Sequence, residues 1–125
     1  MRGGLAVHSQ GCVLIVEPDQ LLRELLERWL VGAGYEVLGD KDHSHGMVFP
    51  HVVITDISDP ASAGATIEAL HSAYAAPILA LSARFRRGLG SSNEAARRLH
   101  VDRVLPKPFT RAELLRAVRE AAKSK

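Results

Sequence analysis

Polar side chains follow four short apolar runs in this sequence, and their types suit one kind of chemistry. Glu17 and Asp19 come after the first run, Asp56 after the second, Ser82 after the third and Lys107 after the fourth. The runs are residues 13–16, 51–55 and 78–81, with residues 101–105 as a weaker candidate. Short β-branched runs of this kind are typical of strands buried on both faces of a sheet. If the strands are parallel, their polar successors gather beyond one edge of the sheet, where ligands bind.

A carboxylate, a hydroxyl and a lysine at one edge suit phosphoryl transfer. Asp56 could act as a nucleophile and form an aspartyl phosphate. A hard cation such as Mg²⁺ prefers carboxylate oxygens and offsets charge on the transferring group. Lys107 would supply a positive charge to a phosphoryl oxygen, and Ser82 one further hydrogen bond. Little else is required, because catalysis of this transfer is mostly positioning and electrostatics.

Helical patterns alternate with the apolar runs. Apolar residues recur at helical spacing between the first and second runs and again between the second and third. Two capping boxes, at Ser91 with Glu94 and at Thr110 with Glu113, predict the starts of two more helices. A weaker strand candidate lies at Val37-Leu38. The alternation predicts an α/β domain with a doubly wound, five-stranded parallel sheet. The helical positions are Leu22, Leu25, Leu26, Trp29 and Leu30 before residues 32–34, then Ile67, Leu70 and Tyr74.

Residues 39–50 interrupt this alternation. They contain two glycines, a proline and little periodicity, so we expect a short or irregular second helix, or a loop. The whole chain has 125 residues, of which 46% are hydrophobic and 24% charged, as in an ordinary globular domain. The predicted organisation is a tail over residues 1–11, one domain over residues 12–122 and a tail over residues 123–125.

The cysteine content, the length of the apolar runs and the charge distribution indicate the environment of the protein. The single cysteine, Cys12, excludes an intrachain disulfide and favours a reducing, cytoplasmic environment. No apolar run approaches the roughly 20 residues that span a bilayer, and the first residues do not form a signal peptide. The net charge of +2 is uneven, with −6 in residues 1–83 and +8 in residues 84–125. This asymmetry indicates either a surface for an acidic partner or, more simply, solvated helix faces.

Four segments in this order resemble the receiver domain of bacterial response regulators. They are VLIVEPD, VVITDISDP with Gly64 eight residues after Asp56, PILALSA and VDRVLPKPF. Each segment alone is a weak signal, whereas four at matching spacing are a strong one. The resemblance covers about residues 12–122 and implies the flavodoxin-like receiver fold of two-component signalling.

The resemblance assigns roles to the polar residues. It makes Asp56 the phosphoacceptor, Ser82 the hydroxyl that turns toward the phosphoryl group, and Lys107 the partner of a phosphoryl oxygen or of unmodified Asp56. The backbone carbonyl of Ser58 would join the Mg²⁺ shell with carboxylates from Glu17, Asp19 and Asp56. A cis peptide bond between Lys107 and Pro108 is also implied. The only catalysis implied is phosphorylation and dephosphorylation of Asp56 itself.

The resemblance also implies partners. A histidine kinase or a phosphotransfer protein would donate the phosphoryl group. A downstream protein, or a second copy in a homodimer, would read the face made by the helix near residues 95–99, the strand near residues 101–105 and the helix after Thr110. Neither membrane binding nor nucleic-acid binding is expected of this domain alone.

The sequence departs from the family pattern after the first strand and before the lysine. The family places two adjacent acidic residues where this chain has Glu17 and Pro18, and proline has no carboxylate. Asp19, one residue later, could substitute as a metal ligand, but as a helix N-cap it has a simpler role, which we favour. Mg²⁺ binding should therefore be weaker than is usual in the family. Val104 stands where the family often has an aromatic switch residue.

Two other functions are open on the sequence. Pro18 leaves room for a degenerate receiver that acts as a phosphate-independent interaction domain. A phosphatase of the haloacid dehalogenase type is disfavoured, because it needs Asp-x-Asp after the first strand, and no GK[ST] loop for nucleotides is present.

His43, His45 and His51 lie close in sequence but lack a recognised zinc spacing, so a polar loop is the simpler interpretation. Arg84, Arg86 and Arg87 could engage an acidic group or act as solvated loop charges.

Overall fold

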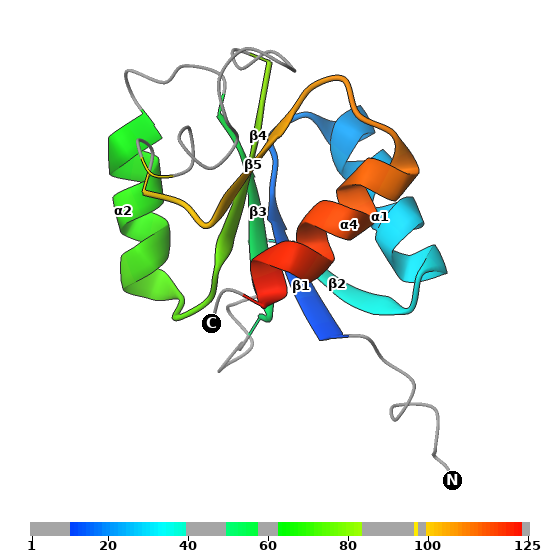
Figure 1. The fold of residues 1–125 in the computed structure, drawn as a ribbon, viewed down its shortest axis with the longest axis horizontal. Coiled ribbons are helices and arrows are strands. Elements are labelled where there is room, and N and C mark those ends of the chain that lie inside the picture. Colours follow the sequence, from blue (N-terminus) through cyan, green and yellow to red (C-terminus); the bar gives the residue numbers. More distant parts are fainter. Residues whose placement is uncertain (1–10, 40–49, 58–62, 84–96, 98–99, 124–125) are drawn as a thin grey trace, which may run out of the picture.

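The computed structural model describes residues 11–39, 50–57, 63–83, 97 and 100–123. Its five strands form one parallel sheet in the order β2-β1-β3-β4-β5, which confirms the predicted doubly wound receiver fold (Figure 1). The strands are β1 (Gly11–Val16), β2 (Tyr35–Gly39), β3 (Val52–Asp56), β4 (Ile78–Ser82) and β5 (Arg103–Pro106). The helices are α1 (Gln20–Gly32), α2 (Ala63–Ala73) and α4 (Arg111–Ala122).

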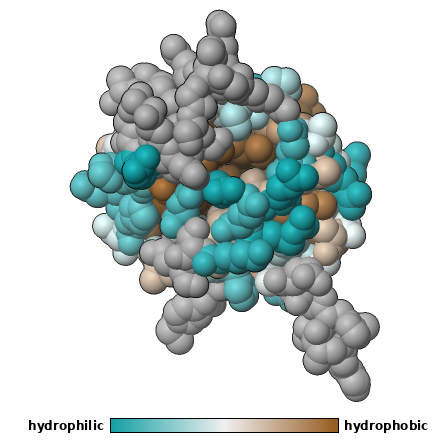
Figure 2. All heavy atoms as spheres, in the orientation of Figure 1, coloured by the Kyte–Doolittle hydropathy of each residue, from teal (hydrophilic) through white to brown (hydrophobic). Residues whose placement is uncertain are grey.

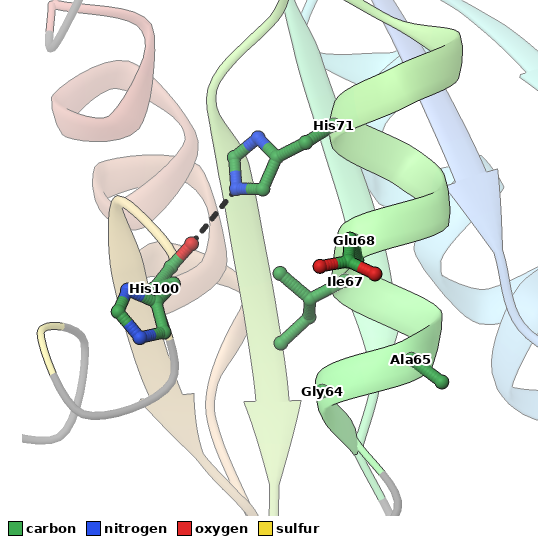
Figure 3. Close-up of a pocket in the computed structure, with 6 residues that line it drawn as sticks. All are labelled: Gly64, Ala65, Ile67, Glu68, His71 and His100. Carbon is green, nitrogen blue, oxygen red and sulfur yellow. Dashed lines mark hydrogen bonds between the residues drawn. The ribbon is translucent and has the colours of Figure 1, made fainter.

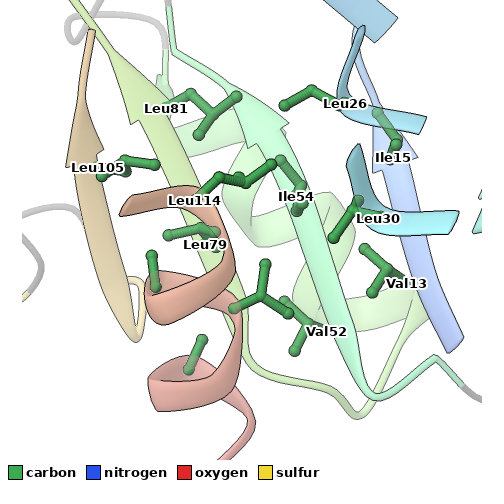
Figure 4. Close-up of a cluster of buried hydrophobic side chains, with 13 residues drawn as sticks. Val13, Ile15, Leu26, Leu30, Val52, Ile54, Leu79, Leu81, Leu105 and Leu114 are labelled. Carbon is green, nitrogen blue, oxygen red and sulfur yellow. The ribbon is translucent and has the colours of Figure 1, made fainter. Parts of the chain in front are cut away.

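The three central strands β1, β3 and β4 are buried on both faces, as their apolar runs predict. Successive side chains of a strand point to opposite faces, so each run supplies two cores. Leu14 of β1 belongs to the core beneath α2, whereas Val13 and Ile15 belong to the core beneath α1 and α4. In the second core, side chains from both helices interdigitate with those of the sheet (Figure 4). The sheet edge that carries the polar residues is therefore mounted on a rigid, two-sided core.

Each described helix covers the face that its apolar stripe predicts. α1 and α4 lie on one face of the sheet and α2 on the other (Figure 1). α1 ends at Gly32, followed by Gly34 at φ +99°, a backbone conformation that suits glycine. α4 begins with the predicted capping box, in which Thr110 Oγ1 accepts from the Glu113 backbone N–H and Glu113 Oε1 accepts from that of Thr110.

The fifth strand begins later than the apolar run predicts. β5 starts at Arg103, and Val101 is buried just before it. Just before β5, the Asp102 carboxylate accepts a hydrogen bond from the Ile78 backbone N–H at 2.8 Å. The Asp102 backbone N–H in turn donates to the Ile78 carbonyl at 3.0 Å. The predicted irregular second helix (residues 39–50) lies almost wholly outside the described residues, and the capping box at Ser91 lies entirely outside them.

Hydrophilic side chains gather over α4, on the side of the molecule that faces the viewer in Figure 2. This helix exposes Arg111, Arg116 and Arg119, and Lys123 just after it is exposed as well. In the part of the chain that the structure describes, no helix is long and apolar enough to cross a membrane.

Candidate functional site at the carboxyl edge of the sheet

The parallel register brings the predicted site residues to one edge. Asp56, the last residue of β3, lies opposite Leu81, and Ser82, the last residue of β4, lies opposite Pro106. Glu17 follows β1 directly, and Lys107 follows β5 directly. The carboxyl ends of the strands therefore place two carboxylates, a hydroxyl and an ammonium group along one edge, as expected for a ligand site in an open α/β sheet.

Asp56 and Lys107 form an ion pair. The Lys107 ammonium contacts Asp56 Oδ1, and the Lys107 and Asp56 side chains are only 28% and 12% exposed. The Lys107 backbone N–H also donates to the carbonyl of Ser82 at 2.9 Å. The peptide bond between Lys107 and Pro108 is cis, as the resemblance implies. The backbone bond between the end of β4 and the turn after β5 thus positions Lys107 against Asp56.

Ser82 lies at the centre of this edge. Its side chain is completely buried, and its backbone carbonyl holds the turn that carries Lys107. The neighbouring β3 chain is fixed as well, because the Ile57 backbone N–H donates to the Leu81 carbonyl at 2.8 Å. Ser82 thus links the backbone around the aspartate with the turn around the lysine.

Glu17 is a buried carboxylate with two unlike oxygens. The residue is 6% exposed. Its Oε2 accepts a hydrogen bond from the Asp19 backbone N–H at 3.0 Å, while Oε1 has no hydrogen-bond partner in the described part of the chain. Burial raises the pKa of this carboxyl above its ordinary value of 4.5, and the negative charges of Asp56 and Asp19 act in the same direction. The Asp19 hydrogen bond and Lys107 partly offset this rise.

Asp19 serves as the N-cap of α1. Its Oδ1 accepts from the backbone N–H groups of Leu21 at 2.9 Å and Leu22 at 3.2 Å, so the carboxylate satisfies two donors that a helix start leaves open. Asp19 and the neighbouring Pro18 are both exposed. The helix-cap interpretation of Asp19 therefore describes its contacts in this structure.

Glu17 gives the physical test of whether this edge suits a divalent cation. A buried carboxylate oxygen without a donor is costly, and a hard cation is the partner that such oxygens take. The donor set of Glu17 and Asp56 therefore fits a cation such as Mg²⁺. Among the described residues, however, no three His, Cys, Asp or Glu side chains group closely enough to hold a metal ion. Ser58, the predicted carbonyl ligand, lies outside those residues.

One contact near Lys107 is not evident from the sequence. Phe109, two residues after Lys107, packs edge-on against Trp29 of α1, with ring centroids 6.3 Å apart and an interplanar angle of 66°. Val104, at the family's switch position, is instead a buried core residue. No sequence signal pairs residues 80 positions apart, so only the packing of α1 beside the turn after β5 reveals this contact.

His51 lies away from this edge. His51 precedes β3 at the opposite end of the sheet, where its Nδ1 accepts from the Cys12 backbone N–H at 2.9 Å. His43 and His45 lie outside the described residues, as do Arg84, Arg86 and Arg87. The predicted grouping of three histidines thus has a single member that can be placed, and its ring nitrogen is used to hold β1.

A pocket of about 880 Å³ lies beside α2 (Figure 3). His71 reaches across it, and its Nε2 lies 2.8 Å from the backbone carbonyl of His100, to which it donates a hydrogen bond. His100 has a positive φ of 62°, which is uncommon for a residue other than glycine. The pocket shares no lining residue with the edge that carries Asp56. Its lining residues are Gly64, Ala65, Ile67, Glu68, His71 and His100.

Comparison with solved structures places the fold. A response regulator receiver protein from Burkholderia phymatum superposes with a TM-score of 0.69 and 21% identity, covering 91% of this chain and 96% of that one. The chemotaxis protein CheY4 of Vibrio cholerae gives 0.64 and 20% identity, covering 90% and 99%. Full-length FixJ from B. japonicum gives 0.63 and 22% identity, covering 93% and 59%. The chain therefore has the fold of response-regulator receiver domains.

Comparison with known sequences finds a relative that matches over part of its length. No protein-family profile matches the chain. Protein PetR of Rhodobacter capsulatus is 33% identical over 112 residues, which cover 82% of this chain and 45% of PetR. The chain thus spans about half the length of this relative.

Proposed function

We propose that the chain is a receiver module of a two-component phosphorelay that accepts a phosphoryl group on Asp56. The observation that carries this proposal is the ion pair between Lys107 and Asp56 at the carboxyl edge of a receiver fold, with Ser82 beside it. The fold alone hosts many functions, so the argument depends on this arrangement of groups.

The chemistry assigned to each residue follows from its position. A carboxylate oxygen of Asp56 attacks the phosphorus of a phosphohistidine on a kinase or phosphotransfer protein. The bond from phosphorus to the donor nitrogen breaks as the new bond to oxygen forms, and the donor imidazole retains the electron pair. Lys107 moves from the Asp56 carboxylate to a phosphoryl oxygen, and the Ser82 hydroxyl donates to another. The oxygens of Glu17 and Asp56 would hold Mg²⁺, which offsets negative charge during transfer.

The output step follows from the shared backbone. Ser82 and Lys107 are joined through the Ser82 carbonyl, so a phosphoryl group that engages both side chains pulls on β4 and on the turn after β5 together. A partner that binds the altered surface shifts the population between two states. Kinase, downstream partner and homodimer contacts all belong to this proposal.

The β1 loop favours a second candidate function. Pro18 replaces an acidic residue, and the Asp19 carboxylate is engaged as a helix cap, so the acidic side of the site is incomplete. A phosphate-independent interaction domain would tolerate this loss. It predicts that Asp56→Asn leaves partner binding unchanged, whereas the phosphoacceptor role predicts that binding no longer responds to phosphorylation.

Modification of Asp56 tests the first candidate directly. The intact protein is incubated with acetyl phosphate, with and without Mg²⁺, and its mass is compared with that of Asp56→Asn. A Mg²⁺-dependent gain of one phosphoryl group in the parent protein alone supports the proposal. The same gain in Asp56→Asn would assign the modification to another residue.

A further inference from the structure

The side chain of Lys107 bridges two strands that are not neighbours. Asp56 ends β3 and Lys107 follows β5, and β4 lies between these strands in the sheet. Adjacent strands lie about 4.8 Å apart, so the ammonium spans about two strand spacings to form its ion pair with Asp56. Holding a long lysine side chain in one geometry costs conformational entropy. A small displacement of the turn after β5 would therefore withdraw the ammonium from the carboxylate.

Hydrogen bonds hold both ends of this turn. At its start, the Lys107 backbone N–H donates to the Ser82 carbonyl at 2.9 Å. At its end, Thr110 caps α4, and its side-chain oxygen accepts from the Glu113 backbone N–H at 3.1 Å. Phe109 lies between these two bonds. A contact made by its ring therefore adds a third point of attachment, two residues from Lys107.

α1 supplies this third attachment. The ring of Phe109 packs edge-on against Trp29, with ring centroids 6.3 Å apart and an interplanar angle of 66°. Both side chains are partly buried against the core beneath α1 and α4. Edge-on aromatic pairs stabilise a structure beyond the area that they bury. The turn that carries Lys107 is thus attached to α1 as well as to β4.

A second contact joins the same two segments near the end of α1. A Cβ built at Gly32 would lie 3.8 Å from a guanidinium nitrogen of Arg111, so this side chain reaches the last turn of α1. That turn has no basic residue of its own. Because the carboxyl end of a helix carries partial negative charge, a guanidinium group there is favourable. Figure 1 shows the start of α4 beside α1, in agreement with both contacts.

We propose that Trp29 is a positioning residue for Lys107. Through Phe109, it holds the turn after β5 at the place from which the ammonium reaches Asp56. The inference rests on the proposed phosphoacceptor function, in which Lys107 moves from Asp56 to a phosphoryl oxygen. It makes α1 a support of the lysine side of the site, so loosening the aromatic contact should slow phosphoryl transfer.

Hydrogen exchange of two backbone amides tests the proposal in the full chain without a phosphoryl donor. The Lys107 N–H reports on the turn, and the Ile57 N–H, which donates to the Leu81 carbonyl at 2.8 Å, reports on the neighbouring backbone. Trp29→Leu should raise the ratio of the Lys107 rate to the Ile57 rate by about three- to ten-fold, as expected for loss of an aromatic contact. Trp29→Phe keeps a ring and should restore most of the parent ratio.

Ile67→Val in α2 is the matched control. It trims the core on the opposite face of the sheet, so it should raise both exchange rates together and leave their ratio unchanged. An unchanged ratio in Trp29→Leu would show that Trp29 only stabilises the fold, and would overturn the proposal. If Trp29→Leu fails to fold, Phe109→Leu removes the same contact from the other side and should raise the ratio.

The rate of Asp56 modification gives a second test. With acetyl phosphate and Mg²⁺, the gain in mass should appear several-fold more slowly in Trp29→Leu than in Ile67→Val, by about the factor expected for the exchange ratio. Equal rates in the two variants would contradict a role of Trp29 in transfer. If the parent protein gains no mass, the phosphoacceptor function fails, and the exchange ratio still decides whether Trp29 positions Lys107.

Discussion

The two sides of the candidate site differ in how completely their charges are matched. On the β3–β5 side, Asp56 is paired with Lys107, and the backbone around Ser82 holds both. On the β1 side, Glu17 is buried with one oxygen unpartnered within the described chain. Among the described residues, the carboxylate on the first side is paired with a cation, whereas Glu17 Oε1 on the second side has no hydrogen-bond partner.

The paired and the unpaired carboxylate should affect the stability of the fold differently. A paired carboxylate contributes to the fold and is also the group that reacts. An unpaired buried carboxylate lowers the stability of the fold, so its presence indicates a role in binding. We therefore expect substitutions on the two sides to change stability in opposite directions.

The largest effect is expected when the ion pair is broken from the lysine side. Lys107→Met leaves the nearly buried Asp56 carboxylate without its cation, which should lower the free energy of unfolding by about 2 kcal/mol. The same substitution made in an Asp56→Asn background should cost much less, because no unpaired charge remains. Urea denaturation of the four proteins in this cycle measures the coupling. Equal costs in both backgrounds would show that the pair contributes nothing.

Removal of the Glu17 charge should have the opposite sign. Without Mg²⁺ at neutral pH, Glu17→Gln should raise the free energy of unfolding by about 1 kcal/mol, because a buried charge becomes a neutral amide. The pKa of Glu17 is raised in the folded protein, so the folded state takes up its proton first as the pH falls. The stability of the parent protein is therefore lowered at pH values above the pKa of Glu17 in the folded state. It recovers as the pH falls toward 4.5, the ordinary pKa of this carboxyl. Denaturation at several pH values should show the advantage of Glu17→Gln shrinking as the pH falls, and a constant or growing advantage would contradict this account.

Asp19 should affect stability through the helix alone. Asp19→Ala removes the acceptor for Leu21 and Leu22 and should lower the free energy of unfolding by about 1 kcal/mol, whereas Asp19→Asn should be nearly neutral. Thermal melts of the two variants at one pH compare the cap with the charge. If Asp19→Asn were as destabilising as Asp19→Ala, the charge and not the cap would matter.

The smallest effect concerns the aromatic contact beside Lys107. Phe109→Leu keeps an apolar side chain but removes the edge-on contact with Trp29, which should cost about 0.5–1 kcal/mol. Trp29 is the single tryptophan of the chain, so its fluorescence reports on this contact. We expect the emission of the parent to change on phosphorylation, because Phe109 lies two residues from Lys107, and the change to be reduced in Phe109→Leu. An identical change in emission in both proteins would show that the Phe109 contact does not transmit the effect of phosphorylation to Trp29.

The three central strands were predictable from their apolar runs, whereas the order of all five in the sheet was implied only through the resemblance to receiver domains. The buried runs of β1, β3 and β4 have a length and composition that suit strands covered on both faces, and the capping box at Thr110 begins α4 where predicted. The start of β5 was not predicted correctly, and the Asp102 side chain just before it bonds to the distant Ile78 backbone N–H. A side-chain contact of this kind leaves no periodic trace in the sequence.

The gathering of four polar groups at one edge was predictable, whereas their roles in a site stay predictions. Asp56, Ser82, Lys107 and Glu17 follow strand ends, and a parallel sheet must bring them together. The unequal oxygens of Glu17 depend on the path of the chain through Pro18 to the Asp19 N–H, which no residue type specifies. The contact between Trp29 and Phe109 likewise depends on how α1 packs beside the turn after β5.

The most direct test of the phosphoacceptor role is the intact mass of the protein after exposure to acetyl phosphate with Mg²⁺, measured beside Asp56→Asn. The account predicts a gain of one phosphoryl group in the parent, no gain in the variant, and loss of the gain when Mg²⁺ is chelated. A parent protein that stays unmodified under these conditions and also when offered a phosphorylated histidine kinase would contradict the account and favour the phosphate-independent interaction domain.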